Sequence, residues 1–362
     1  MTDFRPETLA GTDRYLMTRY RQPSGSDTLV ISFNPVGMDI APMGFGSEFL
    51  LAKGFDHVHV AEAKHDFYQS LPWDRFAELI APVLGDYDKV FTYGQSLGGY
   101  CALFYAAAAK ARPVALAPKL PPHPYALRFQ KNPVWAGTRI IHPDLPEVPR
   151  TPFDPVVCYD PQNPIDNAFV TEFVMPVYPG ATLVPLDHAG HLVAKRLLRE
   201  NRLKELVLSV FRTGDVPKIE LDPTLLPDYN LKQAVDAMDR GDFDAARRCL
   251  DVVVAENPAK PPFIEIADYI ERSGRGFHPM PRPRPQTLRK AFGRLDFSGD
   301  GAPKDALLRM AQAYVRLCDF DTALRLAETA AQLDPDCRRA QAMQKKLGRL
   351  RRIQARGAAP AD

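Results

Sequence analysis

Residues Lys89–Ala106 read KVFTYGQSLGGYCALFYA and place a serine among three glycines between two different hydrophobic patterns. The run before the glycines is rich in β-branched and aromatic residues, which is typical of a strand. The run after them is amphipathic and rich in alanine, which favours a helix. The stretch therefore predicts a strand over Lys89–Tyr93, a tight turn around Ser96 and a helix over Leu97–Lys110.

The same alternation of short and long hydrophobic runs continues on both sides of this stretch. Such alternation predicts strands joined by helices into a mostly parallel sheet. The expected strands are Arg14–Arg19 at an edge, Thr28–Phe33, His57–Ala61, Lys89–Tyr93, Pro113–Ala117, Val156–Tyr159 and Thr182–Leu186. The other expected helices are Gly44–Lys53, Trp73–Leu84, Asp166–Val174 and His191–Arg212. We expect a doubly wound α/β domain over residues 12–212.

The pattern Gly94-Gln95-Ser96-Leu97-Gly98, set between a strand and a helix, resembles the nucleophile turn of the α/β-hydrolase superfamily. Glycines are needed at its ends because a Cβ there would collide with the neighbouring strand or helix. The resemblance implies that Ser96 is the nucleophile of a serine hydrolase. It also implies that the backbone N–H of Leu97, at the start of the helix, is one donor of the oxyanion hole.

A histidine follows the last expected strand, where residues 181–194 read ATLVPLDHAGHLVA. The order of strand, Gly190-His191 and helix resembles the terminal Gly-His of the same superfamily. The resemblance implies that His191 is the general base. His188 is the alternative.

The acid of the triad is expected between residues 155 and 169, which read PVVCYDPQNPIDNAF. In the superfamily the acid often lies about three residues beyond this strand, and Asn163 holds that position here. Asp160 is our first choice because catalytic groups of open α/β sheets gather at the carboxyl ends of strands. Asp166, at the expected start of a helix, is the alternative acid, and a triad that uses Asn163 is a third option.

A second oxyanion donor is expected in the loop after Thr28–Phe33, which begins Asn34-Pro35-Val36-Gly37. Superfamily members often carry His-Gly here, and this loop does not. Pro35 has no N–H to donate. Val36 is therefore the expected donor, with Gly37 as the alternative.

Strand signals end at a linker over residues 213–227, and a helical domain is expected over residues 228–356. Residues 231–258 and 308–335 both carry Asp-Phe-Asp, alanines one turn later and a terminal proline, offset by 77 positions throughout. This pattern resembles tetratricopeptide repeats, which implies an all-α domain of paired helices that binds a protein partner. A proline-rich insert over residues 259–300 interrupts the two repeats.

The net charge of +2 hides an uneven distribution of charge along the chain. Residues 337–362 hold 8 Lys and Arg against 1 acidic residue, whereas the rest of the chain is slightly acidic. No nucleic-acid partner is therefore expected. The tail also places Met343, Leu347, Leu350 and Ile353 on one apolar face, and we favour a helix that caps the repeats over one that contacts an anionic membrane.

The five cysteines form no CxxC pair, which argues against a zinc site or a disulfide framework and for a reducing compartment. We expect a cytoplasmic protein without metal or cofactor. Nucleophile, acid and histidine follow one another in the order that favours acyl transfer to water. The expected function is therefore that of a carboxylic ester hydrolase (EC 3.1.1) acting on a small or carbohydrate-type acyl ester. The alternative is a catalytically degenerate scaffold that acts through its repeats.

Overall fold

The computed structural model describes residues 4, 6–129, 135, 137–239, 245, 248–249, 252–253, 303–316 and 320–357. Contacts divide the chain into two compact units, Met1–Leu221 and Asp222–Asp362. Several expected features lie outside the described residues: the first Asp-Phe-Asp turn at 242–244, Ala246, Pro258, the insert over 259–300 and Cys318.

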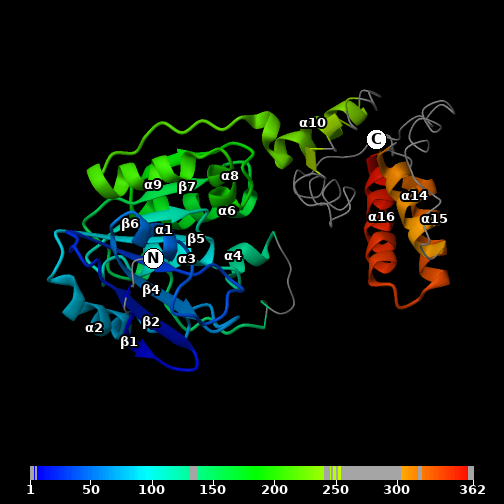
Figure 1. Cartoon of the computed structure of the whole chain (residues 1–362). Helices are drawn as coiled ribbons and strands as arrows, with labels where there is room; N and C mark the ends of the chain where they lie inside the picture. The colour runs from blue at the N-terminus through cyan, green and yellow to red at the C-terminus, as the bar shows by residue number, and fades with distance from the viewer. Residues whose placement is uncertain are drawn as a thin grey trace. The chain divides into compact units, whose positions relative to one another are not determined.

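The first unit is built on one eight-stranded sheet, with the order β1-β2-β4-β3-β5-β6-β7-β8 (Figure 1). The strands are β1 Glu7–Gly11, β2 Tyr15–Tyr20, β3 Thr28–Phe33, β4 Asp56–Glu62, β5 Lys89–Gln95, β6 Arg112–Leu116, β7 Val156–Tyr159 and β8 Thr182–Pro185. The pairs β1–β2 and β2–β4 are antiparallel, and all the others are parallel. The expectation of a mostly parallel α/β sheet is confirmed, and the sheet is consistent with the α/β-hydrolase fold.

The helices of the first unit cover both faces of the sheet. They are α1 Ser47–Ala52, α2 Trp73–Leu84, α3 Leu97–Phe104, α4 Pro124–Leu127, α6 Pro164–Phe169, α7 Met175–Val177, α8 Val193–Arg199 and α9 Arg202–Thr213. Successive residues of a strand face opposite sides, so Phe33 packs in one core with α2 and α3, and Val30 packs in the other with α1, α8 and α9. The sheet is thus buried on both faces, as its continuous hydrophobic strands require.

Two differences from the expected elements have simple physical causes. β1, the true edge strand, was not expected because its sequence ETLAG is short, polar and only partly buried. The helix expected over His191–Arg212 is two helices, because Asn201 adopts a left-handed backbone conformation with φ of 58°. Asparagine is one of the few residues that reach this conformation at low cost.

The described part of the second unit is helical and has its own hydrophobic core. Its helices are α10 Pro227–Asp239, α14 Pro303–Arg316, α15 Phe320–Leu333 and α16 Arg338–Gly357. Phe320, Ala323 and Ala327 of α15 are buried in this core, together with Leu308 and Ala311 of α14. Small side chains on α15 allow the neighbouring helices to approach closely.

Helix α16 buries one side and exposes a basic one. Ala340, Met343, Leu347 and Leu350 are buried in the core of the second unit. This face is therefore occupied by protein, which argues for a capping helix and against insertion of that face into a membrane. Within the described residues, no helix has the length and hydrophobicity to cross a bilayer.

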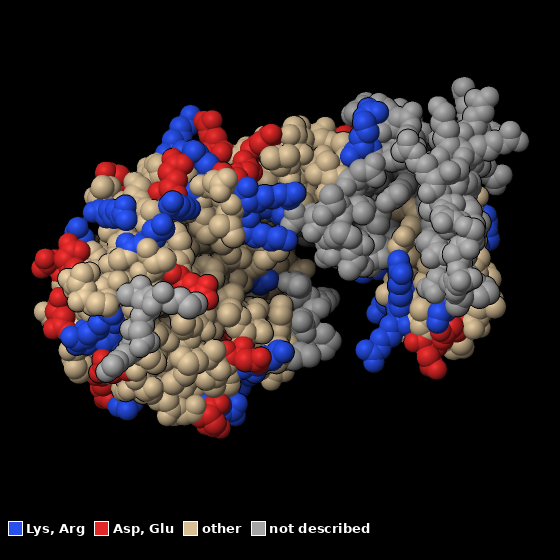
Figure 2. Space-filling model, viewed as in Figure 1, with Lys and Arg blue, Asp and Glu red and all other residues tan. Residues whose placement is uncertain are grey.

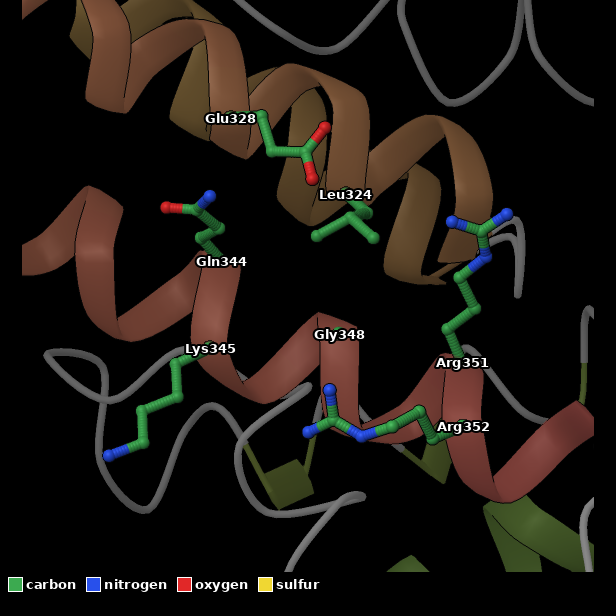
Figure 3. A pocket seen from close by; sticks show the side chains of 7 residues that line it. All are labelled: Leu324, Glu328, Gln344, Lys345, Gly348, Arg351 and Arg352. Atoms are coloured by element: carbon green, nitrogen blue, oxygen red, sulfur yellow. The ribbon is translucent and has the colours of Figure 1, made fainter.

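Charge is distributed differently in the two units. Figure 2 shows acidic and basic side chains interspersed over the visible face of the first unit. In the second unit, Figure 3 shows a hollow between α15 and α16 with several cations around it. It is lined by Leu324, Glu328, Gln344, Lys345, Gly348, Arg351 and Arg352. The hollow belongs to the second unit and holds none of the residues expected to carry chemistry.

Candidate active site

The turn between β5 and α3 holds Ser96 in a strained backbone conformation, with φ of 56° and ψ of −120°. The chain passes so close to its neighbours that glycine is required on both sides of the serine. A Cβ on Gly94 would lie 2.3 Å from the carbonyl group of Gly98, and one on Gly98 would lie 2.2 Å from Phe33 O. Strain of this kind persists where the surrounding structure over-determines it, and it concentrates at functional sites.

Ser96, His191 and Asp166 form a continuous chain of hydrogen bonds. Ser96 Oγ lies 2.8 Å from His191 Nε2, and His191 Nδ1 lies 2.8 Å from Asp166 Oδ1. The carboxylate accepts the Nδ1–H bond, which leaves Nε2 able to accept the hydroxyl proton of the serine. Three residues from three separate segments of the chain therefore have the geometry of a nucleophile, a base and a carboxylate that orients the base.

Asp166 occupies this position because of the residue that begins its helix. Asn163 is the N-cap of α6, and its Oδ1 accepts hydrogen bonds from the backbone N–H groups of Ile165 and Asp166. Asp166 is fully buried, and its Oδ2 has no hydrogen-bond partner within the described residues. The asparagine in the expected acid position therefore acts as a cap.

Asp160, our first choice for the acid, has a different place in the structure. Its Oδ2 accepts the backbone N–H of Gly190 at 2.8 Å, and its Oδ1 accepts that of Gln162 at 2.9 Å. The carboxylate that His191 contacts is that of Asp166, which favours the alternative acid over Asp160. Asp160, directly after β7, instead holds the turn before His191 through Gly190.

His188, the alternative base, lies on the same loop as His191 but is directed elsewhere. Its Nε2 lies 3.2 Å from Gln162 Nε2, and its backbone has a positive φ of 63°. His191 is the histidine within hydrogen-bond distance of Ser96.

Of the two expected oxyanion donors, Leu97 directly follows Ser96, and Val36 lies just after β3, the strand that pairs with β5. Leu97 is the first residue of α3, where an N–H group has no partner within the helix and the helix dipole favours negative charge. Val36 belongs to the turn that follows β3, and it packs on the core shared with α3. The tight contact between Gly98 and Phe33 O brings this turn against the start of α3.

A buried lysine that sequence reasoning missed lies next to this site. Lys119 follows the end of β6, and its backbone N–H donates to Ser96 O at 3.0 Å. Its ammonium group lies 5.6 Å from the ring centroid of Trp135. Burial lowers the pKa of Lys119, while the nearby Asp166 carboxylate opposes this shift. The one sequence signal for Lys119 was its position shortly after an expected strand. In the structure this strand, β6, ends beside the serine.

The residues at the end of β4 and just after it form a second group that sequence reasoning missed. Glu62 is buried, and burial raises its pKa to about 8. Its Oε2 accepts the backbone N–H of Tyr68 at 2.8 Å. The sequence around Tyr68, HDFYQ, offered aromatic residues near the site but no sign of these contacts.

The described residues contain no group of three or more His, Cys, Asp or Glu side chains arranged to bind a metal ion. Of the cysteines, Cys101, Cys158 and Cys337 are free thiols.

No family model matches this sequence, and no curated protein matches it. Several solved structures match part of this chain. A predicted CIB-like hydrolase from Thermoplasma acidophilum is 11% identical, with a TM-score of 0.36, and the match covers 56% of this chain and 95% of that one. Est1E from Butyrivibrio proteoclasticus is 11% identical, with a TM-score of 0.35 and coverage of 57% and 98%.

Acetyl xylan esterase 1 from a Thermoanaerobacterium species is 15% identical, with a TM-score of 0.37, and the match covers 52% of this chain and 78% of that one. Similarity at this level does not transfer an activity, because one fold supports many unrelated functions. Any functional conclusion must therefore be drawn from the site itself.

Proposed function

We propose that the first unit is a serine hydrolase that cleaves a carboxylic ester of a small or carbohydrate-type acyl compound. The observation that carries this proposal is the chain Ser96–His191–Asp166, with two successive contacts of 2.8 Å. The serine stands on a strained turn at the start of a helix, as a nucleophile of this class requires. The parallel strands β5, β7 and β8 end on one side of the sheet, and the segments that follow them carry Ser96, Asp166 and His191.

In the first step, Ser96 Oγ attacks the ester carbonyl carbon while His191 Nε2 takes the hydroxyl proton. The carbonyl oxygen becomes an oxyanion, which the N–H groups of Leu97 and Val36 stabilise. The Asp166 carboxylate stabilises the imidazolium and holds its orientation. Collapse of the intermediate breaks the bond to the alcohol, which leaves with the proton from Nε2, and Ser96 keeps the acyl group.

In the second step, a water molecule replaces the alcohol. His191 Nε2 takes a proton from this water as its oxygen attacks the acyl carbon, and the same oxyanion donors act again. The bond to Ser96 Oγ then breaks, and Oγ recovers its proton from the imidazolium. The products are a carboxylic acid and the free enzyme.

The alternative of a degenerate scaffold drew its support from Asn163, which holds the position expected for the acid. That support weakens because Asn163 caps α6 and Asp166 stands beside His191. For the second unit, we propose a tetratricopeptide-like module that binds a protein partner. The burial of Phe320 and Ala323 between neighbouring helices supports this part of the proposal.

Turnover of p-nitrophenyl acetate and labelling by a fluorophosphonate test the proposed mechanism. We expect the wild type to do both and Ser96→Ala to do neither. Ser47→Ala is the matched control, because Ser47 Oγ also lies close to a histidine, 2.9 Å from His57 Nε2, but that histidine is fully buried, whereas the His191 side chain is partly exposed. Equal turnover by the wild type and Ser96→Ala would show that the proposed mechanism is wrong.

A further inference from the structure

The segment after β4 contains three non-glycine residues with a left-handed backbone. These are His65, Phe67 and Tyr68, with φ of 69°, 53° and 58°. Bulky side chains rarely adopt this conformation, and a cluster of them must be held by its surroundings. The strain raises the question of what the segment holds in place.

The segment places the phenol of Tyr68 where β3 and β4 separate. Phe33 and Val60 form the last pair between these strands. Just beyond this pair, Asn34 N donates to Tyr68 Oη at 2.8 Å, and Tyr68 Oη donates to Val60 O at 3.0 Å. Tyr68 is 1% exposed, so these contacts are shielded from water. Beyond this pair the backbone contact from Asn34 N to Val60 O is long, at 3.4 Å, and the phenol bridges the two strands at this point.

Asn34 is the first residue of the turn that carries Val36. Its side chain also closes the following loop, because Oδ1 accepts the N–H of Phe45 at 3.0 Å. A Cβ on Gly98 would lie 3.1 Å from Asn34 O, so Asn34 touches the helix that begins after Ser96. A displacement of Asn34 would therefore move the Val36 N–H relative to Ser96.

Hydrogen bonds of the Tyr68 backbone and of the next residue hold Tyr68 itself in place. Its N–H donates to the buried Glu62 carboxyl group at 2.8 Å. The next residue, Gln69, accepts the N–H groups of Ile141 and His142 through Oε1. The strained segment thus ties the turn after β3 to the chain that follows β6.

We propose that Tyr68 is a positioning residue that fixes the turn Asn34–Gly37, and with it the Val36 N–H, for stabilisation of the oxyanion. This inference rests on the proposed ester hydrolysis. Tyr68 does not touch the reacting atoms and acts through Asn34. An oxyanion donor contributes most when its position is set before the charge develops.

The test compares Tyr68→Phe with Tyr105→Phe in the full chain. Tyr105 is a matched control because it is also fully buried, and its hydroxyl donates to Leu71 O at 2.5 Å, away from Asn34. We expect Tyr68→Phe to lower kcat for p-nitrophenyl acetate at least about tenfold with KM within about twofold. Inhibition by a boronic acid, which mimics the tetrahedral intermediate, should weaken by a similar factor. Tyr105→Phe should change neither quantity more than about twofold.

A second pair of variants tests the same support without removing the phenol. Glu62→Ala removes the acceptor for Tyr68 N–H, and Glu62→Gln keeps an acceptor oxygen. We expect kcat to fall in Glu62→Ala at unchanged KM and to be restored in Glu62→Gln. If Tyr68→Phe does not fold, the comparison of the two Glu62 variants tests the inference.

Equal losses of kcat in Tyr68→Phe and Tyr105→Phe would overturn the inference, since a general loss of stability would then explain both. Equal kcat in the two Glu62 variants would overturn it as well. Failure of the proposed function has a different signature, because the wild type itself would then show no turnover that depends on Ser96.

Discussion

Two serine–histidine hydrogen bonds of the first unit differ in the group behind the imidazole. Ser96 Oγ lies 2.8 Å from His191 Nε2, and His191 Nδ1 lies 2.8 Å from the Asp166 carboxylate. Ser47 Oγ lies 2.9 Å from His57 Nε2, and His57 Nδ1 donates to the backbone carbonyl of Val30 at 2.8 Å. Both acceptors orient the ring, but a carboxylate stabilises an imidazolium far better than a neutral carbonyl does.

The surroundings of the two pairs differ as well. His57 is fully buried, and burial lowers its pKa to about 4. The side chain of His191 is 26% exposed and stands near the strained turn of Ser96. A short serine–histidine contact therefore does not identify a catalytic site. A buried ring cannot readily take a proton, and Ser47 lies within the core between α1 and the sheet.

The largest expected effect concerns the carboxylate behind the imidazole. We expect Asp166→Asn to lower kcat for p-nitrophenyl acetate by about 10⁴, because the amide neither stabilises the imidazolium nor holds the required tautomer. Steady-state kinetics at pH 7.5 measure this change.

Asp160→Asn is the matched control for Asp166→Asn, since Asp160 accepts backbone N–H groups near the same loop. Its kcat should fall no more than about tenfold, through a small displacement of His191. A larger loss in Asp160→Asn than in Asp166→Asn would return Asp160 to the role of acid.

A smaller effect is expected on stability at acid pH, from the buried pair. The pKa of His57 is about 4 in the folded protein and 6.5 when unperturbed. Protonation therefore favours the unfolded state as the pH falls below about 6.5, and the associated loss of stability is nearly complete at pH 4. This difference corresponds to about 3 kcal/mol.

We expect His57→Gln to lose about 3 kcal/mol less stability than the wild type between pH 7.5 and pH 4. Urea unfolding followed by tryptophan fluorescence measures this loss of stability for the first unit, because both tryptophans, Trp73 and Trp135, lie there. Turnover of p-nitrophenyl acetate at pH 7.5 should stay within about twofold of the wild type. Parallel stability curves for the two proteins would show that His57 does not titrate in this way.

The smallest expected effect comes from the serine of the buried pair. Ser47→Ala removes a hydroxyl that bonds His57 and accepts the N–H of Gly44 at 3.0 Å. Leaving these groups without a partner should lower the free energy of unfolding by about 1–3 kcal/mol with no change in kcat. Loss of turnover in Ser47→Ala at full stability would contradict the structural role that we assign to this pair.

Local sequence patterns predicted much of the fold. The elements Thr28–Phe33, Trp73–Leu84 and Val156–Tyr159 have the bounds expected from hydrophobic periodicity alone. The glycines around Ser96 predicted a tight turn, and the steric requirement at Gly94 is local because a Cβ there would meet Gly98. The helix expected over Leu97–Lys110 ends at Phe104. The prediction ran too far because the residues beyond Phe104 contain no signal that separates a helix end from a turn.

The sequence by itself determined the alternation of strands and helices, the tight turn that carries Ser96 and the Gly-His pair at His191, because each depends on neighbouring residues. Only the tertiary structure showed which carboxylate His191 contacts, because Asp160 directly follows β7, Asp166 lies in α6, and their side chains point in different directions. It alone showed the contact between Tyr68 and Asn34, which lie 34 positions apart in the chain. Contacts of this kind arise when a sheet brings distant loops to one edge, and no local pattern of residues encodes them.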